Sequence, residues 1–333
     1  MSGASEVARP AAGARLSATL KRITSWREFN VVLAVILLSA ILAVSSDAFL
    51  TSANLFSVMR AFSLTAIMAV GQTIVILTAG IDLSVGSIMG LSGLFTAMII
   101  HDGYPVELAV VVGLLTGSGV GLCNGLMVTK LRLPPFIATL GTLSMGRGLM
   151  YWITHGWPVT LSFEHPFLAL GQGYVGPVPV PVIVMLALYI AAAIFLSRTS
   201  IGRYIYAVGG NEQAARFSGI RVNWVKIVVY TISGFCCAVS GLILLARMVS
   251  AQPMAGLGYE LPVIAACAIG GTSLMGGEGT ILGTLMGAAL MGILQNGMVL
   301  VGIDTYAQQA VTGAVIVIAV TLDQWRQRRA AVS

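Results

Sequence analysis

Charged side chains are scarce in this sequence. Only 9% of its 333 residues are Asp, Glu, Lys or Arg, whereas 57% are hydrophobic, and an ordinary soluble domain carries about 25% charged residues. The mean hydropathy is correspondingly high, at +0.93. This composition excludes a water-soluble globular protein, and the absence of short, strictly alternating segments argues against a membrane β-barrel. It predicts an all-α polytopic membrane protein.

Residues that carry catalytic or metal chemistry are equally few. None of the three lysines follows a glycine, so the chain has no P-loop and cannot bind ATP in that way. The three histidines are too far apart for a H-E-x-x-H zinc helix, and no G-x-S-x-G nucleophile motif occurs. The four cysteines lie in apolar stretches, without disulfide or zinc spacing: Cys123, Cys236, Cys237 and Cys267. We therefore expect no enzyme, metal or cofactor, and we interpret the cysteines as packing residues.

Apolar runs separated by polar residues predict about ten transmembrane helices in one domain, 29–323. A run of about 20 apolar residues is long enough to cross a hydrocarbon layer about 30 Å thick. The expected spans are 29–46, 61–79, 85–100, 106–129, 136–154, 180–197, 224–248, 262–271, 280–300 and 306–322. The eighth is too short to cross alone, which predicts a broken helix whose free backbone groups are covered by protein or by a water-filled cavity.

The basic residues predict which side of the membrane each loop occupies. Of the 18 lysines and arginines, 15 fall on one predicted side, which the positive-inside rule makes cytoplasmic. The exceptions are Arg60, Arg147 and Arg247, and the opposite loop 155–179 has neither Lys nor Arg. We expect a multi-pass protein of the cytoplasmic membrane with an N-terminal arm (1–28), a large loop (198–226) and a C-terminal tail (324–333) in the cytoplasm. The basic charge then reflects topology and not nucleic-acid binding.

The first apolar run is close to spanning length and follows a long basic segment. We therefore expect an uncleaved anchor at this end of the chain and not a signal peptide.

A motif of the form G-x-acid-L-[S/P]-V occurs twice, at Gly80 and at Gly258. A second pair, Asn-Gly at 124 and at 296, recurs at a similar offset. Each pair lies five spans apart, and an odd shift reverses the direction of crossing. The pattern predicts two inverted five-helix repeats with a pathway at their interface, although chance coincidence in a glycine-rich sequence stays open. Glycines every fourth residue from Gly113 to Gly125 predict close helix packing.

The longest polar loop contains a predicted short helix. Asn211 is a good N-cap, Glu212 suits the positive helix start, and Gly219 can close the helix in the left-handed conformation. Such a helix could contact a soluble partner, and a solvated connector is the alternative.

Four long motifs carry a resemblance to a known family. They are GQTIVILTAGIDLSVGSIMGLSG at 71–93, LPPFIATLGTLSMGRGL at 133–149, AVGGNEQAARFSGI at 207–220 and AIGGTSLMGGEGTILGTLMGA at 268–288. With them the chain resembles the permease subunits of ABC sugar importers of the ribose type, in a wider family that includes branched-chain amino acid permeases. The amino acid branch is less similar around GIDLSVG, so the resemblance favours a sugar or sugar-like solute.

The resemblance implies a permease dimer in the lipid membrane, cytoplasmic ABC ATPase subunits and an extracytoplasmic sugar-binding protein. It also implies that one segment transmits movement from the ATPase, with the candidate coupling residues Asn211, Glu212, Ala215, Arg216 and Gly219. An ion-gradient-driven secondary transporter, an ABC permease for branched-chain amino acids, an exporter and a non-transporting scaffold are the alternatives. The particular sugar or polyol, and whether the dimer pairs identical chains, stay open.

Polar residues inside the predicted spans are candidates for the pathway. Ser144, Arg147, Tyr151 and Thr154 share one helical face, and an arginine within a bilayer needs a cavity or a partner. Pathway lining, helix–helix ion pairing and snorkelling are the alternatives for Arg147. Further candidates are Gln72, Gln295 and Asn296, for which interhelical hydrogen bonds are equally plausible.

The acids of the repeated motif are candidate gates. We expect Asp82 near the cytoplasmic end of the pathway and Glu260 near the opposite end, because the repeat inverts them. Each is hypothesised to hold a glycine-rich turn shut by accepting hydrogen bonds from backbone amides. A structural helix cap is the alternative.

Overall fold

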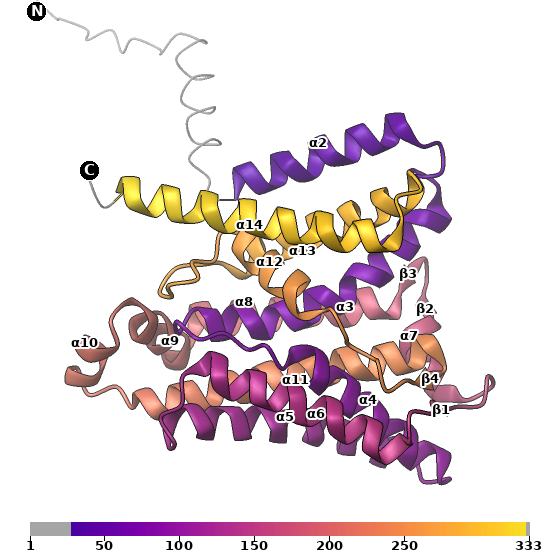
Figure 1. Ribbon diagram of the computed structural model, residues 1–333, viewed down its shortest axis with the longest axis horizontal. Coiled ribbons are helices and arrows are strands. Elements are labelled where there is room, and N and C mark those ends of the chain that lie inside the picture. Colours follow the sequence, from indigo (N-terminus) through magenta and orange to yellow (C-terminus); the bar gives the residue numbers. More distant parts are fainter. Residues whose placement is uncertain (1–27, 331–333) are drawn as a thin grey trace, which may run out of the picture.

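The computed structural model describes residues 28–330, and these fold almost entirely into helices (Figure 1). The predicted N-terminal arm, apart from its last residue, lies outside the described residues. The helices are α2 (Phe29–Ser45), α3 (Ser52–Ile76), α4 (Val85–His101), α5 (Val106–Thr129), α6 (Pro135–Thr154), α7 (Ala169–Gln172), α8 (Val180–Arg198), α9 (Ser200–Gly210), α10 (Glu212–Phe217), α11 (Val222–Met248), α12 (Glu260–Ile269), α13 (Ile281–Leu300) and α14 (Thr305–Ala330), with a 3₁₀ turn η1 (Pro166–Leu168).

Four two-residue strands form two small antiparallel pairs. β1 (Val159–Thr160) pairs with β4 (Ser250–Ala251), and β2 (Tyr174–Val175) pairs with β3 (Val178–Pro179). The first pair joins the α6–α8 connection to the α11–α12 connection, which the predicted topology places on the same side of the membrane.

Each predicted span overlaps one helix, and the all-α prediction is confirmed. By length and composition, five described helices could cross a membrane: α3, α5, α8, α11 and α13. Shorter apolar helices are α2, α4, α12 and the segment Tyr306–Ile318 of α14, so the full count of ten crossings stays a prediction. The eighth span is α12, with ten residues, which is about 15 Å and half of the hydrocarbon layer. The last helix continues to Ala330, beyond the predicted start of the tail at 324.

The long helices lie roughly side by side, and the two ends of the molecule differ (Figure 1). Helices α9 and α10 project from one end, where α2 also begins and toward which α14 runs. The four strands and α7 lie at the opposite end. This arrangement gives the molecule one helical end and one strand-bearing end.

One long helix of each half of the sequence packs against helices of the other half. α11, from the second half, packs against α4 and α5 of the first half, whereas α3 packs against α12 and α13 of the second half. Small residues permit these contacts: a Cβ added at Gly117 or Gly121 of α5 would overlap the α11 backbone at Gly234 or Tyr230. The predicted role of these glycines in close packing is confirmed.

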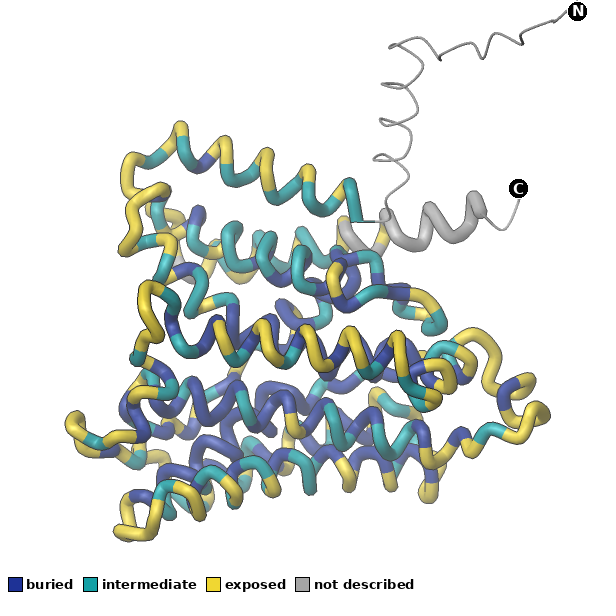
Figure 2. The backbone as a smooth tube through the Cα atoms, turned by 180° about the vertical axis from the view of Figure 1, so that it is seen from behind, coloured by how far each residue is buried: buried dark blue, intermediate teal, exposed yellow. Residues whose placement is uncertain are grey.

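Burial follows the same arrangement (Figure 2). Buried residues concentrate in the middle of the molecule, and the outer helices carry exposed residues. Many of these exposed side chains are large and apolar, for example Ile36 and Ile41 on α2 and Ile190 and Ile194 on α8. Extended apolar surface of this kind suits contact with lipid.

Candidate functional site

Two short helices begin deep inside the molecule and meet there. α4 follows an irregular segment, 77–84, and α12 follows another, 252–259. Gly86 and Gly256 are in direct backbone contact, because a Cβ added to either would overlap the carbonyl oxygen of the other. The carboxylate of Glu260 lies against Gly86 as well. The starts of α4 and α12 therefore pack on each other, an arrangement of broken helices that membrane transporters often use at their binding sites.

The prediction that Asp82 and Glu260 lie at opposite ends of the pathway is wrong. Gly86, which contacts the Glu260 carboxylate, is only four residues from Asp82. Four residues span at most about 14 Å, less than half of a hydrocarbon layer of about 30 Å. The repeat predicts direction but not depth, and both irregular segments carry the chain back into the protein before the helix starts.

Asp82 is fully buried, and both of its carboxylate oxygens accept hydrogen bonds. Oδ1 accepts from the Ser84 N–H at 2.9 Å and from the Ser84 hydroxyl at 2.5 Å, and Oδ2 accepts from the Ser233 hydroxyl of α11 at 2.9 Å. The bond to its own backbone two residues on organises the turn into α4, and the bond to Ser233 ties that turn to α11.

The bonds around Asp82 continue into two further helices. The Asn124 side-chain amide of α5 donates to the Ser84 hydroxyl at 2.8 Å, and its oxygen accepts from the Thr142 hydroxyl of α6 at 2.6 Å. We call Asp82, Ser84, Asn124, Thr142 and Ser233 the buried polar network. All five side chains are buried, and Asn124 entered the sequence analysis only through the repeat. Ser84, Thr142 and Ser233 were missed there, because single hydroxyl residues in apolar runs carry no distinctive pattern.

Gln72 belongs to the surroundings of this network. With its amide oriented to satisfy both groups, it donates to the Asp82 carbonyl at 3.0 Å and accepts from the Asp82 N–H at 3.3 Å. Gln72 is fully buried. In this conformation it holds the turn before α4 in place.

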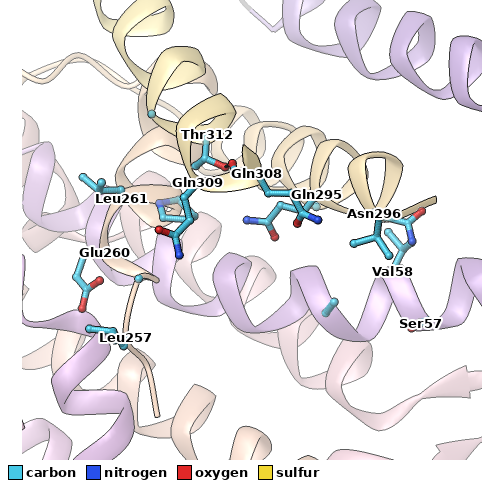
Figure 3. Close-up of a pocket in the computed structure, with 16 residues that line it drawn as sticks. Ser57, Val58, Leu257, Glu260, Leu261, Gln295, Asn296, Gln308, Gln309 and Thr312 are labelled. Carbon is cyan, nitrogen blue, oxygen red and sulfur yellow. Dashed lines mark hydrogen bonds between the residues drawn. The ribbon is translucent and has the colours of Figure 1, made fainter. Parts of the chain in front are cut away.

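Glu260 is the first residue of α12 and is mostly buried, with 8% of its surface exposed. Its Oε1 has no hydrogen-bond partner among the described residues. It lies beside a cavity of about 810 Å³ between α3, α12, α13 and α14 (Figure 3). The lining residues are Ser57, Val58, Ala61, Leu257, Gly258, Glu260, Leu261, Pro262, Gly292, Gln295, Asn296, Val299, Gln308, Gln309, Thr312 and Gly313. We call this space the Glu260 cavity.

Two predicted pathway residues, Gln295 and Asn296, line the Glu260 cavity. Asn296 also exchanges two hydrogen bonds with Asn54 of α3, at 2.8 and 3.1 Å, so it joins helices as well. The polar residues that α14 contributes were missed: Gln308, Gln309 and Thr312. Their signal in the sequence is the polar cluster at the start of the last apolar run.

Arg147 of α6 connects to the segment before α12. Its Nη1 donates to the carbonyl oxygens of Pro253 at 3.1 Å and Ala255 at 2.8 Å, while Nε and Nη2 have no partner among the described residues. Ser144 and Tyr151 are exposed on the same helix. The predicted α6 face therefore lies outside the Glu260 cavity, and Arg147 ties α6 to the segment that leads into it.

The short helix predicted at 211–219 is present as α10. The Asn211 side-chain oxygen accepts from the Ala214 N–H at 2.9 Å, and Gly219 has a left-handed φ of +84°. Ala215 is buried. The helix and both of its predicted ends are confirmed.

Glu212 joins α10 to its surroundings. Its carboxylate pairs with Lys226 of α11 at 2.7 Å and with Arg216, one turn along α10, at 3.1 Å. The hydrogen bond from Lys226 is the main reason that the pKa of Glu212 lies below its ordinary value. Partial burial opposes this shift, and the charge of Lys226 and the contact with Arg216 add to it.

A contact chain leads from α10 toward Asp82. Gly209, at the end of α9, packs against the Leu77 carbonyl, which also accepts a hydrogen bond from the Gly277 N–H at 3.0 Å. Leu77 is the first residue after α3 and lies five residues before Asp82. Phe217, at the end of α10, is an apolar side chain that is 90% exposed, and no pattern in the sequence indicated it.

No group of three or more His, Cys, Asp or Glu side chains that could hold a metal ion occurs within the part of the chain that the structure describes.

Comparisons with known proteins identify the family of this chain. The family model described as "Branched-chain amino acid transport system / permease component" matches residues 54–320. The ribose import permease protein RbsC of Escherichia coli (strain K12) is 45% identical over 299 residues, covering 89% of this chain and 93% of that protein. RbsC of Bacillus subtilis (strain 168) is 43% identical over 293 residues, covering 88% and 91%. The D-allose transport system permease protein AlsC of E. coli (strain K12) is 37% identical over 301 residues, covering 90% and 92%.

One solved structure shares the fold. It is described as an inward-facing conformation of a metal-chelate type ABC transporter and aligns with a TM-score of 0.52, covering 90% of this chain and 98% of that one. At 14% identity, this similarity concerns the fold alone.

Proposed function

This chain belongs to the family of permease components of branched-chain amino acid transport systems, and we propose that it is the membrane subunit of an ABC importer for a sugar or sugar-like solute. The observation that carries the solute class is the identity of 35 to 45% to permeases whose names specify ribose, D-allose and L-arabinose. Since the chain has no P-loop, ATP is hydrolysed by a separate cytoplasmic subunit.

The ATPase subunit docks at the helical end of the molecule. The candidate coupling residues Asn211, Glu212, Ala215, Arg216 and Gly219 form or cap α10 there. Exposed Phe217 supplies an apolar side chain for the partner to bury. The contact chain through Gly209 and Leu77 then carries ATP-driven movement of α10 to the turn that Asp82 holds.

The membrane topology follows from the same assignment. Ten crossings in two inverted repeats place both termini and α10 in the cytoplasm, and the strand-bearing end faces the sugar-binding protein. The reciprocal packing of α3 and α11 on the helices of the other half supports this symmetry.

A second permease copy covers the exposed face of α6. Ser144 and Tyr151 are exposed there beside Arg147, and polar groups facing lipid are costly. This face therefore lies against the second copy or a water-filled pathway in the assembled importer. Asp82 and Glu260 act as gates on either side of the Gly86–Gly256 contact.

ATP-driven uptake of labelled D-ribose, D-allose and L-arabinose by the reconstituted complex tests the proposal. We expect uptake that needs ATP, the ATPase subunit and the binding protein, and that is lost with Asn211→Ala combined with Phe217→Ala. Sugar uptake by ATP-free vesicles under an ion gradient would instead establish a secondary transporter.

The family description also suggests branched-chain amino acids, and leucine is the matching test solute. An amino acid carries a carboxylate, whereas the described lining of the Glu260 cavity has no Lys or Arg to pair with it. We expect no leucine uptake in the same preparation.

A further inference from the structure

The Glu260 cavity has a polar lining, although it lies between apolar helices. Its hydrogen-bonding residues come from four helices: Ser57, Glu260, Gln295, Asn296, Gln308, Gln309 and Thr312. Its volume of about 810 Å³ falls within the range of small-molecule binding sites, roughly 300 to 1,000 Å³. Both the size and the lining suit a polar ligand.

Some of these groups are already satisfied within the protein. The Thr312 hydroxyl donates to the Gln308 carbonyl at 2.8 Å, and the Gln308 side-chain amide donates to the Ile303 carbonyl at 2.8 Å. Asn296 is paired with Asn54. These bonds fix the wall of the cavity and leave other polar groups free.

Two groups remain for a ligand, one from α13 and one from α14. They are the exposed side-chain amides of Gln295 and Gln309, which form no hydrogen bond to any other described residue. Glu260 of α12 also borders the cavity, but its unpartnered Oε1 is buried against Gly86. Polar groups without partners cost free energy in an apolar environment. These groups favour water or a polar solute over lipid chains in this space.

We propose that the Glu260 cavity is a solute-binding site within each copy of the permease, and that it takes an uncharged polyhydroxylated molecule of sugar size. The proposal rests on the proposed function and names the place where the solute binds. Each glutamine amide both donates and accepts hydrogen bonds, as the hydroxyl groups of such a molecule do. The described lining has no cationic side chain for an anion and one carboxylate only, which favours a neutral ligand.

The position of the cavity suits a solute that arrives from the strand-bearing end. Ser57 lies near the start of α3, Gln308 near the start of α14 and Gln295 near the end of α13. In Figure 1 these helix ends lie toward the strands and away from α9 and α10. A solute released by a binding protein would reach this site before it reaches the turn held by Asp82.

Protection of a cysteine in the cavity wall tests the proposal directly. Ser57→Cys is the reporter, because it is nearly isosteric and leaves Glu260, Gln295 and Gln309 unchanged. Cys123, the exposed native cysteine, is changed to Ser, and the other three cysteines are buried. The complete complex in lipid nanodiscs is treated with a membrane-impermeant thiol reagent, with and without D-ribose, D-allose or L-arabinose.

We expect one of these sugars to slow the labelling several-fold, whereas trimethylamine N-oxide at the same osmolarity does not. Adding Gln309→Leu or Gln295→Leu should abolish the protection while labelling continues. Thr321→Cys is the matched control, because it lies further along α14, is exposed and does not line the cavity; no sugar should protect it.

Two results would overturn the proposal. Labelling of Ser57→Cys at the same rate with and without every sugar means that no sugar binds there. No labelling at all in nanodiscs means that lipid fills the cavity. If ATP-driven sugar uptake persists when the same complex is reconstituted in closed vesicles, only the binding site is wrong; if uptake is absent there, the proposed function fails as well.

Discussion

The two acids of the repeated motif lie close together in the molecule and have opposite surroundings. Asp82 is fully buried and has both oxygens engaged by serines, whereas Glu260 borders a cavity with Oε1 unpartnered. The motif itself explains part of the difference. The position two residues after the acid is Ser84 in the first copy and Pro262 in the second, and proline has neither an N–H nor a hydroxyl to donate. Serine at this position therefore gives Asp82 two hydrogen-bond donors, whereas proline gives Glu260 none.

The contrast has a functional reading under the proposed mechanism. The hydrogen-bonded carboxylate of Asp82 holds the turn before α4 against α11. Movement of α10 is then transmitted to a fixed contact between these two helices. The Glu260 carboxylate, by contrast, has one oxygen without a hydrogen bond among the described residues, and an arrangement of this kind costs stability. The first half then supplies a fixed support and the second half a binding surface.

Asp82→Ala should have the largest effect on stability. It leaves the hydroxyls of Ser84 and Ser233 without their acceptor in a fully buried place, and bonds to charged groups contribute about 1.5 to 3 kcal/mol each. We expect a loss of roughly 3 kcal/mol or more, seen as a clear fall of Tm for the full chain in detergent. An unchanged Tm would show that the hydrogen bonds of Asp82 do not stabilise the fold, and the contrast with Glu260 would fail.

Asp82→Asn tests the gate separately from these stabilising hydrogen bonds. It keeps the shape and one acceptor oxygen, so more of the Tm should survive than in Asp82→Ala, while uptake and ATPase coupling fall. Unchanged uptake together with an unchanged coupling of ATPase activity to transport would contradict the hypothesis that Asp82 is a gate.

Ser84→Ala should have an intermediate effect. It removes the hydroxyl that links Asp82 to Asn124 but keeps the backbone N–H bond, so we expect a loss of about 1 to 3 kcal/mol. Ser87→Ala is the matched control, because the Ser87 hydroxyl is equally buried but bonds only to the Ser84 carbonyl of its own turn. Equal Tm values for the two variants would show that the buried polar network contributes nothing beyond local bonds.

Glu260→Gln should change stability by less than about 1 kcal/mol, because Oε1 has no hydrogen-bond partner among the described residues to lose. Uptake of sugar should nevertheless fall, since the amide replaces an acceptor with a donor. A fall of Tm as large as that of Asp82→Asn would contradict the contrast between the two acids.

Glu212 gives the smallest expected effect and a reference for a carboxylate paired at the surface. Its pKa lies below the ordinary value of 4.5 through Lys226. The stabilising contribution is therefore present above pH 4.5 and is lost as the pH falls through the lowered pKa. Since the pair is partly exposed, it contributes at most about 1 kcal/mol.

Hydrogen exchange of the α10 amides measures this contribution. Protection in the wild type should decrease on acidification below pH 4.5, while Glu212→Gln should start lower and vary less. Identical pH profiles for the two proteins would show that the Lys226 pair does not stabilise α10.

Local patterns in the sequence were sufficient to locate the long helices but not all of their ends, since the span predicted at 61–79 belongs to α3, which begins at Ser52. Apolar runs located each long helix, and Asn211 and Gly219 located α10, because capping depends on residues within one or two turns. The short α12 was also predictable from the length of its apolar run. The repeated motif identified Glu260 as a candidate residue, but the sequence did not predict how deeply it lies in the molecule.

The sequence by itself determined that this protein is helical, embedded in a membrane and without an ATP site of its own, because composition and hydrophobic period act locally along the chain. Only the tertiary structure decided that Asp82 is tied to Ser233, that Arg147 bonds the Ala255 carbonyl and that α14 completes a cavity beside Glu260. The first two pairs are 151 and 108 residues apart. Their contacts depend on how the long helices of one half pack into the other, and no local pattern encodes that packing.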